Sequence, residues 1–265
     1  MGRRCKKQLG MAAAGALLAT LVAALSACGP KPPHGLRAGP EAKVVAVRDD
    51  ASLKLEQAGL VHLAALDFPH GAATVAETPK TAALGRRVRF YFDGAERDQS
   101  GALSGQIYAR DEAGRWFWLQ RGLVESGLAR VRPQPVDRSG AAALLPFEAA
   151  ARGAKKGIWA DPALAVRTAD AAALSTETGA FVLVEGKVVS VGRVAHRVFL
   201  NFGADYKTDF TVTIPEEAWS AWPGGAPYLL NLKDEKVRVR GVLTELNEPS
   251  LEAVTPAQIE ALGPG

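Results

Sequence analysis

The chain has 265 residues, enough for two domains of ordinary size, and a formal net charge of +4 at pH 7, from 32 Lys and Arg against 28 Asp and Glu. Four of these cations and none of the anions lie in residues 1–27, so residues 28–265 carry 28 charges of each sign and a net charge of zero. The basic excess therefore belongs to the N-terminal segment and gives no support to nucleic acid as a partner.

The first residues have the pattern of an export signal. Arg and Lys precede an Ala- and Leu-rich run over residues 11–25, which is too short to span a membrane. Leu25-Ser-Ala-Cys28 resembles a bacterial lipobox, which implies a lipoprotein signal peptide over residues 1–27 and acylation of Cys28. An ordinary secretory cut beside an incidental cysteine is the alternative. With Cys5 removed and Cys28 acylated, no cysteine pair remains for a disulfide.

The lipobox resemblance also implies a location. Gly29 rather than Asp follows Cys28, which in the best-known sorting scheme directs a lipoprotein to the outer membrane. Several acyl chains on one residue anchor a protein stably. We therefore predict an exported protein, lipid-anchored to the bacterial envelope at the periplasmic face of the outer membrane, with an envelope partner of unknown identity. Residues 28–40, rich in Pro and Gly, predict a semi-rigid tether.

Residues 41–161 predict a first domain of short strands and helices. A short helix over residues 119–126 is expected to end at Gly127. A later helix has Pro146 in its first turn and Glu148 four residues before Arg152. Alternation and turn residues indicate strands over residues 43–47, 52–56, 60–66 and 87–92, and a hairpin from 104 to 118.

Residues 60–70, Leu-Val-His-Leu-Ala-Ala-Leu-Asp-Phe-Pro-His, resemble the segment Val-Arg-Leu-x-Gly-Ile-Asp-x-Pro-Glu of the thermonuclease (staphylococcal-nuclease-like) family. Residues 122–131 and 148–159 resemble, in the same order, the family's Leu-Val-x-x-Gly-Leu-Ala-x-Val segment and its closing helix. The resemblance implies an α+β fold, a five-stranded barrel of the oligonucleotide-binding (OB) type with packed helices.

The resemblance also implies a catalytic site, which this chain fills poorly. In the family an Arg binds phosphate, an Asp holds calcium and a Glu positions or deprotonates the attacking water; here these positions are His62, Asp67 and His70. The second calcium carboxylate becomes Ala51, and the second phosphate Arg becomes Ala102. Loss of one charged hydrogen-bond donor that stabilises the transition state raises the activation free energy by about 2–4 kcal/mol. We therefore expect a binding or scaffold module that no longer cleaves DNA or RNA. A metal-dependent nuclease with an altered site is the alternative, with calcium as its cofactor if the family activity persists.

A second alternative is a transition-metal site. If the resemblance holds, His62, Asp67 and His70 all point toward one cleft, and two imidazoles with a carboxylate are a ligand set for zinc or a similar ion. Against this stands the simpler interpretation that both histidines replace charged residues in a cleft without catalytic demand. No other cofactor is predicted.

A connector over residues 162–178, part of which could be helical, precedes residues 179–265. Strand patterns over residues 181–191, 197–202, 210–214, 236–243 and 250–254 resemble the barrel that often trails thermonuclease-like domains in proteobacteria, which implies a second OB-like barrel. Val237 and Val239 alternate with Arg238 and Arg240, so one side of this sheet is expected to face solvent.

The second domain also offers a candidate binding surface for nucleic acid. Its residues are Arg238, Arg240, Phe199 and Tyr206. However, residues 161–265 carry 9 cations and 14 anions, a net charge of −5, which favours an ordinary solvated sheet face. Trp219 and Trp222 are either exposed contacts for a partner or caps on the barrel.

Overall fold

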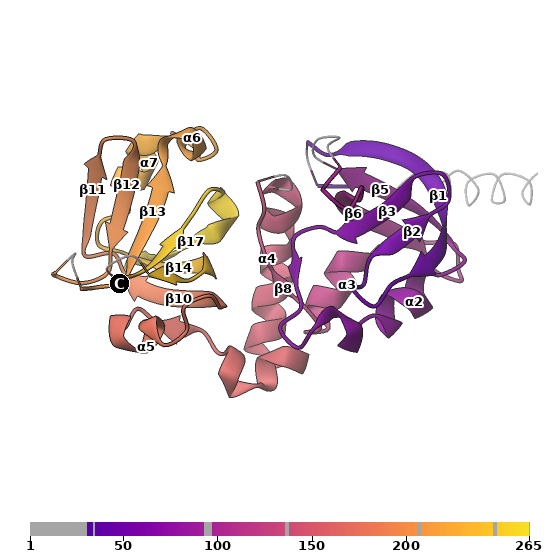
Figure 1. Cartoon of the computed structure of the whole chain (residues 1–265), viewed down its shortest axis with the longest axis horizontal. Helices are drawn as coiled ribbons and strands as arrows, with labels where there is room; N and C mark the ends of the chain where they lie inside the picture. The colour runs from indigo at the N-terminus through magenta and orange to yellow at the C-terminus, as the bar shows by residue number, and fades with distance from the viewer. Residues whose placement is uncertain are drawn as a thin grey trace, which may run out of the picture.

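The computed structural model describes residues 31–33, 35–92, 97–135, 138–205, 208–245 and 248–264. It contains two domains, with the long helix α4 (Arg138–Gly153) of the first domain lying between them (Figure 1). Within these described ranges, no helix is long and apolar enough to cross a membrane. The predicted signal peptide and Cys28 lie outside the described residues.

The first domain is a mixed α+β fold around a closed five-strand barrel, as predicted. Antiparallel pairings run from β3 through β2, β1 and β5 to β6, and the parallel pairing of β3 with β6 closes the barrel. Alternate residues such as Val44, Val61 and Ile107 are fully buried inside it. The strands are β1 (Arg37–Val47), β2 (Leu53–Leu55), β3 (Gly59–Leu63), β5 (Arg87–Phe92) and β6 (Leu103–Arg110), and β7 (Trp116–Trp118) extends the sheet beside β6.

The barrel strand β1 begins earlier than the predicted domain boundary at residue 41. Arg37 and Ala38 pair with Phe92 and Tyr91 of β5, and the register shifts between Ala38 and Glu41. A bulge at this point accommodates a proline in a strand, because a bulged residue needs no ladder hydrogen bond. Residues 37–40 are therefore strand rather than tether.

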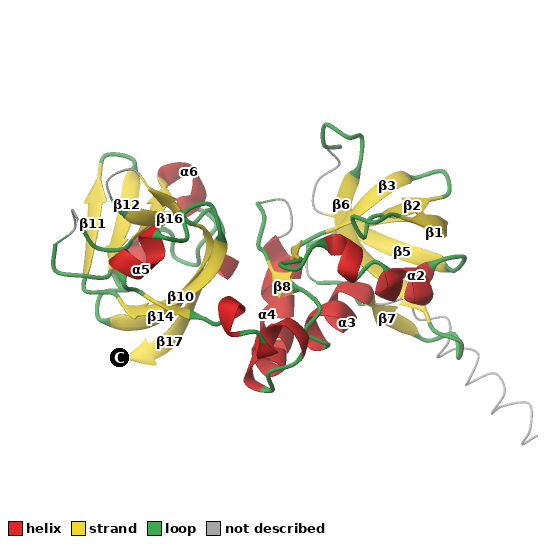
Figure 2. Cartoon of the chain, turned by 60° about the horizontal axis from the view of Figure 1, so that its bottom comes forward, coloured by secondary structure: helices red, strands yellow, loops and turns green. Residues whose placement is uncertain are grey.

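Helices α3 (Leu119–Glu125) and α4 lie between the barrel and the second domain (Figure 2). The predicted contact of Glu148 with Arg152 is present at 3.3 Å. Pro146, however, lies inside α4, which begins at Arg138, so its predicted place in the first turn is wrong. The remaining elements are β4 (Leu66–Asp67), η1 (Ala72–Thr74), α2 (Glu77–Ala83), β8 (Arg130–Val131) and η2 (Gly157–Ala160).

The second domain contains two sheets, in the strand orders β17-β14-β10-β9 and β11-β12-β13-β16-β15. In the described residues no strand pairing joins them, so the two sheets are not closed into the predicted second barrel. Trp219 and Trp222 are buried in the core of this domain and are not exposed contacts.

The strands of the second domain are β9 (Arg167–Thr168), β10 (Phe181–Lys187), β11 (Ser190–Val194), β12 (Arg197–Asn201), β13 (Thr211–Pro215), β14 (Glu235–Val242), β15 (Thr244–Glu245), β16 (Pro249–Glu252) and β17 (Ile259–Pro264). Its helices are η3 (Pro162–Leu164), α5 (Ala171–Ser175), α6 (Glu216–Trp219), α7 (Ala226–Leu230) and η4 (Pro256–Gln258). The predicted connector thus contains only short helices and one short strand.

The two domains pack on each other through β14. Val237 and Val239 point into the second core, as the alternation predicted, but Arg240 on the opposite side is also fully buried. Its guanidinium lies 2.8 Å from Glu148 of α4 and 2.5 Å from Glu260, and it donates to the backbone oxygen of Val131 at 3.1 Å. The prediction of a solvent-facing side at Arg240 is therefore wrong, because the first domain covers this part of the sheet.

Candidate functional site

A cavity of about 510 Å³ opens beside β3 in the first domain. Its lining includes two of the predicted site positions, His62 and Ala102. It also includes Asp50, Arg97, Asp98, Ser104 and Gln134, none of which was predicted. We refer to this cavity as the barrel cleft.

His62 is held by a carboxylate that the sequence pattern did not assign to the site. Its Nε2 lies 3.2 Å from Oδ2 of Asp98. The other carboxylate oxygen accepts hydrogen bonds from the amide and hydroxyl of Ser100, at 2.8 and 2.6 Å, and from the amide of Ala102 at 3.0 Å. The hydroxyl of Ser100 and these amides hold the pKa of Asp98 below its usual value, and His62 adds to the effect.

Asp50, which also lines the barrel cleft, occupies a similar turn. Its carboxylate accepts from both the amide and the hydroxyl of Ser52. Burial tends to raise the pKa of Asp50, but the Ser52 hydrogen bonds and the nearby His62 and Arg48 outweigh it, so this pKa is lowered. Ala51 between them has φ +60° and is buried, so the lost carboxylate position is filled by a methyl group inside the core.

Arg97 is the one arginine among the lining residues of the barrel cleft, and its guanidinium is already hydrogen-bonded within the protein. Arg97 donates to the backbone oxygens of Gly101 at 2.8 Å and Ala58 at 3.0 Å. A guanidinium that bridges two backbone carbonyls closes a loop and has less freedom to form the bidentate contact that a phosphate needs. Arg97 is thus no replacement for the arginine positions filled by His62 and Ala102.

Asp67, the one family position that matched, does not line the barrel cleft. Arg130 donates from Nε and Nη2 to the same oxygen of Asp67, at 2.9 and 2.6 Å, and Arg132 lies 3.7 Å from its other oxygen. The side chains of Asp67 and Arg130 are only 15% and 8% exposed. The carboxylate therefore belongs to an internal ion pair that joins β4 to β8.

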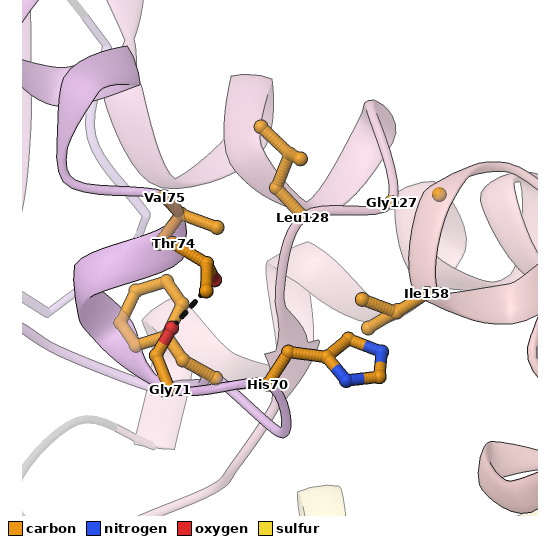
Figure 3. Close-up of a pocket in the computed structure, with 9 residues that line it drawn as sticks. His70, Gly71, Thr74, Val75, Gly127, Leu128 and Ile158 are labelled. Carbon is orange, nitrogen blue, oxygen red and sulfur yellow. Dashed lines mark hydrogen bonds between the residues drawn. The ribbon is translucent and has the colours of Figure 1, made fainter.

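His70 lies in a different place from His62. Figure 3 shows its imidazole beside Ile158, at the edge of a cavity of about 340 Å³ that Gly127 and Leu128 also line. Its nearest carboxylate is Asp161, at 3.7 Å. This cavity is mainly apolar and brings no second predicted site residue to His70.

The structure therefore does not bring His62, Asp67 and His70 together, and the predicted cluster is wrong. Among the described residues, no group of three His, Cys, Asp or Glu side chains could hold a metal ion. The physical reason is local: β3 ends at Leu63, Ala65 turns the chain with φ +62°, and the carboxylate of Asp67 then pairs with Arg130 instead of facing the barrel cleft.

The candidate surface of the second domain is also not formed as predicted. Arg240 is buried, and Arg238 is 14% exposed with Nε donating to Glu185 at 2.8 Å. Phe199 lines a separate cavity of about 360 Å³ with Asn201, Thr211 and Glu248. Tyr206 lies outside the described residues. The two arginines are therefore engaged within the protein and not offered to a ligand.

Residues 69–161 match the family model described as staphylococcal nuclease homologue, abbreviated SNase. The match supports an SNase domain over residues 69–161. His70 and Ala102 fall inside the matched range, whereas Ala51, His62 and Asp67 precede it. The assignment of those three to family positions therefore rests on the local resemblance alone. A search of curated proteins found no match to the chain.

The lining residues that the sequence analysis missed did carry a signal. Asp50-Ala51-Ser52 and Asp98-Gln99-Ser100 share the pattern Asp-x-Ser, in which the carboxylate caps the amide two residues later. Both turns point a carboxylate toward the barrel cleft. The family resemblance assigns a role to Ala102, at an arginine position, but none to Asp98 four positions before it.

Proposed function

We propose that this chain is an envelope lipoprotein whose SNase domain has lost phosphodiester hydrolysis and acts as a binding or scaffold module. The observation that carries the proposal is the pairing of Asp67 with Arg130. A carboxylate that is 15% exposed and bonded twice by a buried guanidinium is not offered to a calcium ion.

The charge of the barrel cleft supports the same proposal. Its lining places two carboxylates, Asp50 and Asp98, where a phosphodiester would have to approach. Both have lowered pKa values, so both are ionised at neutral pH. The two ionised carboxylates repel the negatively charged phosphate of a substrate in the barrel cleft. Arg97 does not offset this repulsion, because its guanidinium is bonded to backbone carbonyls rather than facing the anion.

The alternative is a metal-dependent nuclease that uses Asp50, His62 and Asp98 in place of the family's residues. The geometry favours it less, because Ser52, Ser100 and Ala102 already donate to one oxygen of each carboxylate, and His62 faces the second oxygen of Asp98. These contacts hold one oxygen of each carboxylate within its own turn, and His62 takes the second oxygen of Asp98, so among these carboxylate oxygens only Oδ2 of Asp50 has no hydrogen-bond or ion-pair partner within the described residues.

We also propose that the second domain is related to OB-type barrels. β13 pairs in parallel with β16, while β11, β12 and β13 form an antiparallel meander. β10 continues into β11, and β14 into β15, so each of these chain segments contributes to both sheets. This strand order supports an OB-like relation, with the two sheets connected by chain continuity rather than by a ladder.

Calcium titration tests the proposal at the site itself. Calorimetry of the mature chain with calcium chloride is expected to give no saturable binding in the millimolar range, and the same result with Asp50→Asn/Asp98→Asn. Saturable binding that the double substitution removes would show a working metal site and contradict the proposal. The mass of the protein purified from bacterial membranes reports separately on acylation of Cys28.

A further inference from the structure

The outer side of the β5–β6–β7 sheet combines basic and aromatic side chains. Arg110 lies beside Trp116 in the β6–β7 ladder, and Arg89 lies beside Tyr108 in the β5–β6 ladder. Lys43 of β1 pairs with Arg87 of β5. We define the basic–aromatic face by six residues of these strands: Lys43, Arg87, Arg89, Arg110, Trp116 and Trp118.

The aromatic rings of this face are stacked with its cations. The guanidinium carbons of Arg110 and Arg89 lie 4.4 and 5.1 Å from the centre of the Trp116 ring. Trp118 stacks on Tyr108 with ring centres 5.8 Å apart. Such contacts hold indole rings and cations in one partly exposed layer.

The charge of the basic–aromatic face is strongly positive on a chain whose mature part has no net charge. The face carries four cations. One acidic side chain of β1, Glu41, lies among them and forms an ion pair with Arg89 at 3.3 Å. Lys43 and Arg87 are exposed, and among the described residues neither has an ion-pair partner. The face therefore complements an anionic surface.

The start of the described chain lies on this same side. The backbone oxygen of Lys31 accepts a hydrogen bond from the hydroxyl of Tyr108, at 3.3 Å. Cys28 precedes Lys31 by three residues, so chain length alone keeps its Cα within about 11 Å of that of Lys31. Acyl chains on Cys28 would thus hold the bilayer close to Tyr108 and its neighbours.

We infer that the basic–aromatic face rests on the anionic surface of the membrane in which Cys28 is anchored. The inference rests on the proposed acylation of Cys28, which favours a lipid surface over nucleic acid as the occupant. Arg and Trp side chains are suited to contact with a membrane surface, because cations attract anionic headgroups and indole rings prefer the membrane interface. The acyl chains provide the anchor, and the face sets the orientation, with α4 and the second domain directed away from the lipid.

Vesicle binding tests this inference without the anchor. The mature chain with Cys28→Ser is sedimented with vesicles of neutral lipid alone and with vesicles that contain phosphatidylglycerol. We expect binding only to the anionic vesicles, weakened by salt. Arg87→Gln and Arg110→Gln should each lower the binding constant roughly fivefold, which corresponds to about 1 kcal/mol per basic residue. Arg193→Gln and Arg197→Gln, each with the same loss of one charge on the second domain, should leave it unchanged.

The acylated full chain gives a second readout in vesicles with brominated acyl chains. Trp159, Trp219 and Trp222 are buried, so quenching of tryptophan fluorescence should fall sharply in Trp116→Phe/Trp118→Phe. Three results would overturn the inference: no preference for anionic vesicles, equal binding by the arginine variants, or binding of labelled DNA or RNA through these residues without vesicle binding. A missing acyl mass on Cys28 would instead contradict the proposed anchor, while the vesicle result for Cys28→Ser would still stand.

Discussion

Asp67 shows how a matching residue can have a different task. The local sequence around it resembles the calcium position of the thermonuclease family, yet its carboxylate is bonded by the buried Arg130. Phe181 of the second domain lies beneath Arg130, with the guanidinium carbon 5.0 Å from the ring centre. The pair therefore connects β4, β8 and the adjacent domain, which is a structural role.

This role predicts a large stability effect at Asp67. Asp67→Ala leaves the guanidinium of Arg130 without its main partner and is expected to lower the free energy of unfolding by about 2–4 kcal/mol. Asp98→Ala, at a side chain that is 48% exposed, should cost about 1 kcal/mol or less. Urea unfolding followed by circular dichroism measures both. Similar small costs for the two variants would contradict the structural assignment of Asp67.

At the same scale, sequence alone identified His62 and Ala102 as residues of the barrel cleft but misplaced Asp67 and His70. Their placement came from the family resemblance, which carries no information on the turn at Ala65, where φ is +62°, or on the pairing of Asp67 with Arg130. Arg240 was misplaced for another reason. Periodicity separates the two sides of β14 correctly but carries no information on whether a second domain covers one of them.

At the scale of elements, the backbone that follows α3 packs closely against the backbone at the start of η2 in the SNase domain. The amide of Ile158 donates to the oxygen of Gly127 at 2.9 Å, so the two backbones are in direct contact. A Cβ on Gly157 would lie 2.2 Å from that oxygen. The sequence predicted the helix end at Gly127, because a glycine directly after a helix is a strong signal for its end.

Gly157→Ala should therefore be strongly destabilising. The added methyl group collides with backbone, which cannot rotate away as a side chain can, and we expect a loss of at least about 2 kcal/mol. Gly153→Ala is a matched control, since a Cβ there meets no atom within 4 Å. Thermal unfolding of the two variants gives the comparison, and equal midpoints would argue against the close approach of Gly127 and Gly157.

At the scale of the whole molecule, the two domains form one packed unit. Arg240 joins Glu148 of α4 to Glu260 of β17, and both Arg240 and Glu148 are fully buried. An apolar cluster adds to this contact, since Leu183 of β10 packs with Ile158 and Trp159. Stretches of sequence predicted both domains, but only the fold reveals that ionic and apolar contacts couple them.

We predict that this coupling makes the chain unfold in one transition. Glu148→Gln removes the charge that faces Arg240 and is expected to cost about 3 kcal/mol and to separate the calorimetric transition into two. Glu125→Gln is the control, because Glu125 pairs with Arg121 of the same helix at the surface, where both side chains are 47% exposed. A single unshifted transition in Glu148→Gln would show that the buried pair does not couple the domains.

The central claim is that this SNase domain does not cleave phosphodiesters. The direct measurement is incubation of the purified residues 28–265 with labelled DNA and RNA in the presence of calcium, magnesium, manganese or zinc, followed by electrophoresis. We predict that the DNA and RNA stay intact even when the protein is present at the same concentration as the nucleic acid. Metal-dependent cleavage that disappears in Asp50→Asn/Asp98→Asn, with folding unchanged, would contradict the claim and place the reaction in the barrel cleft.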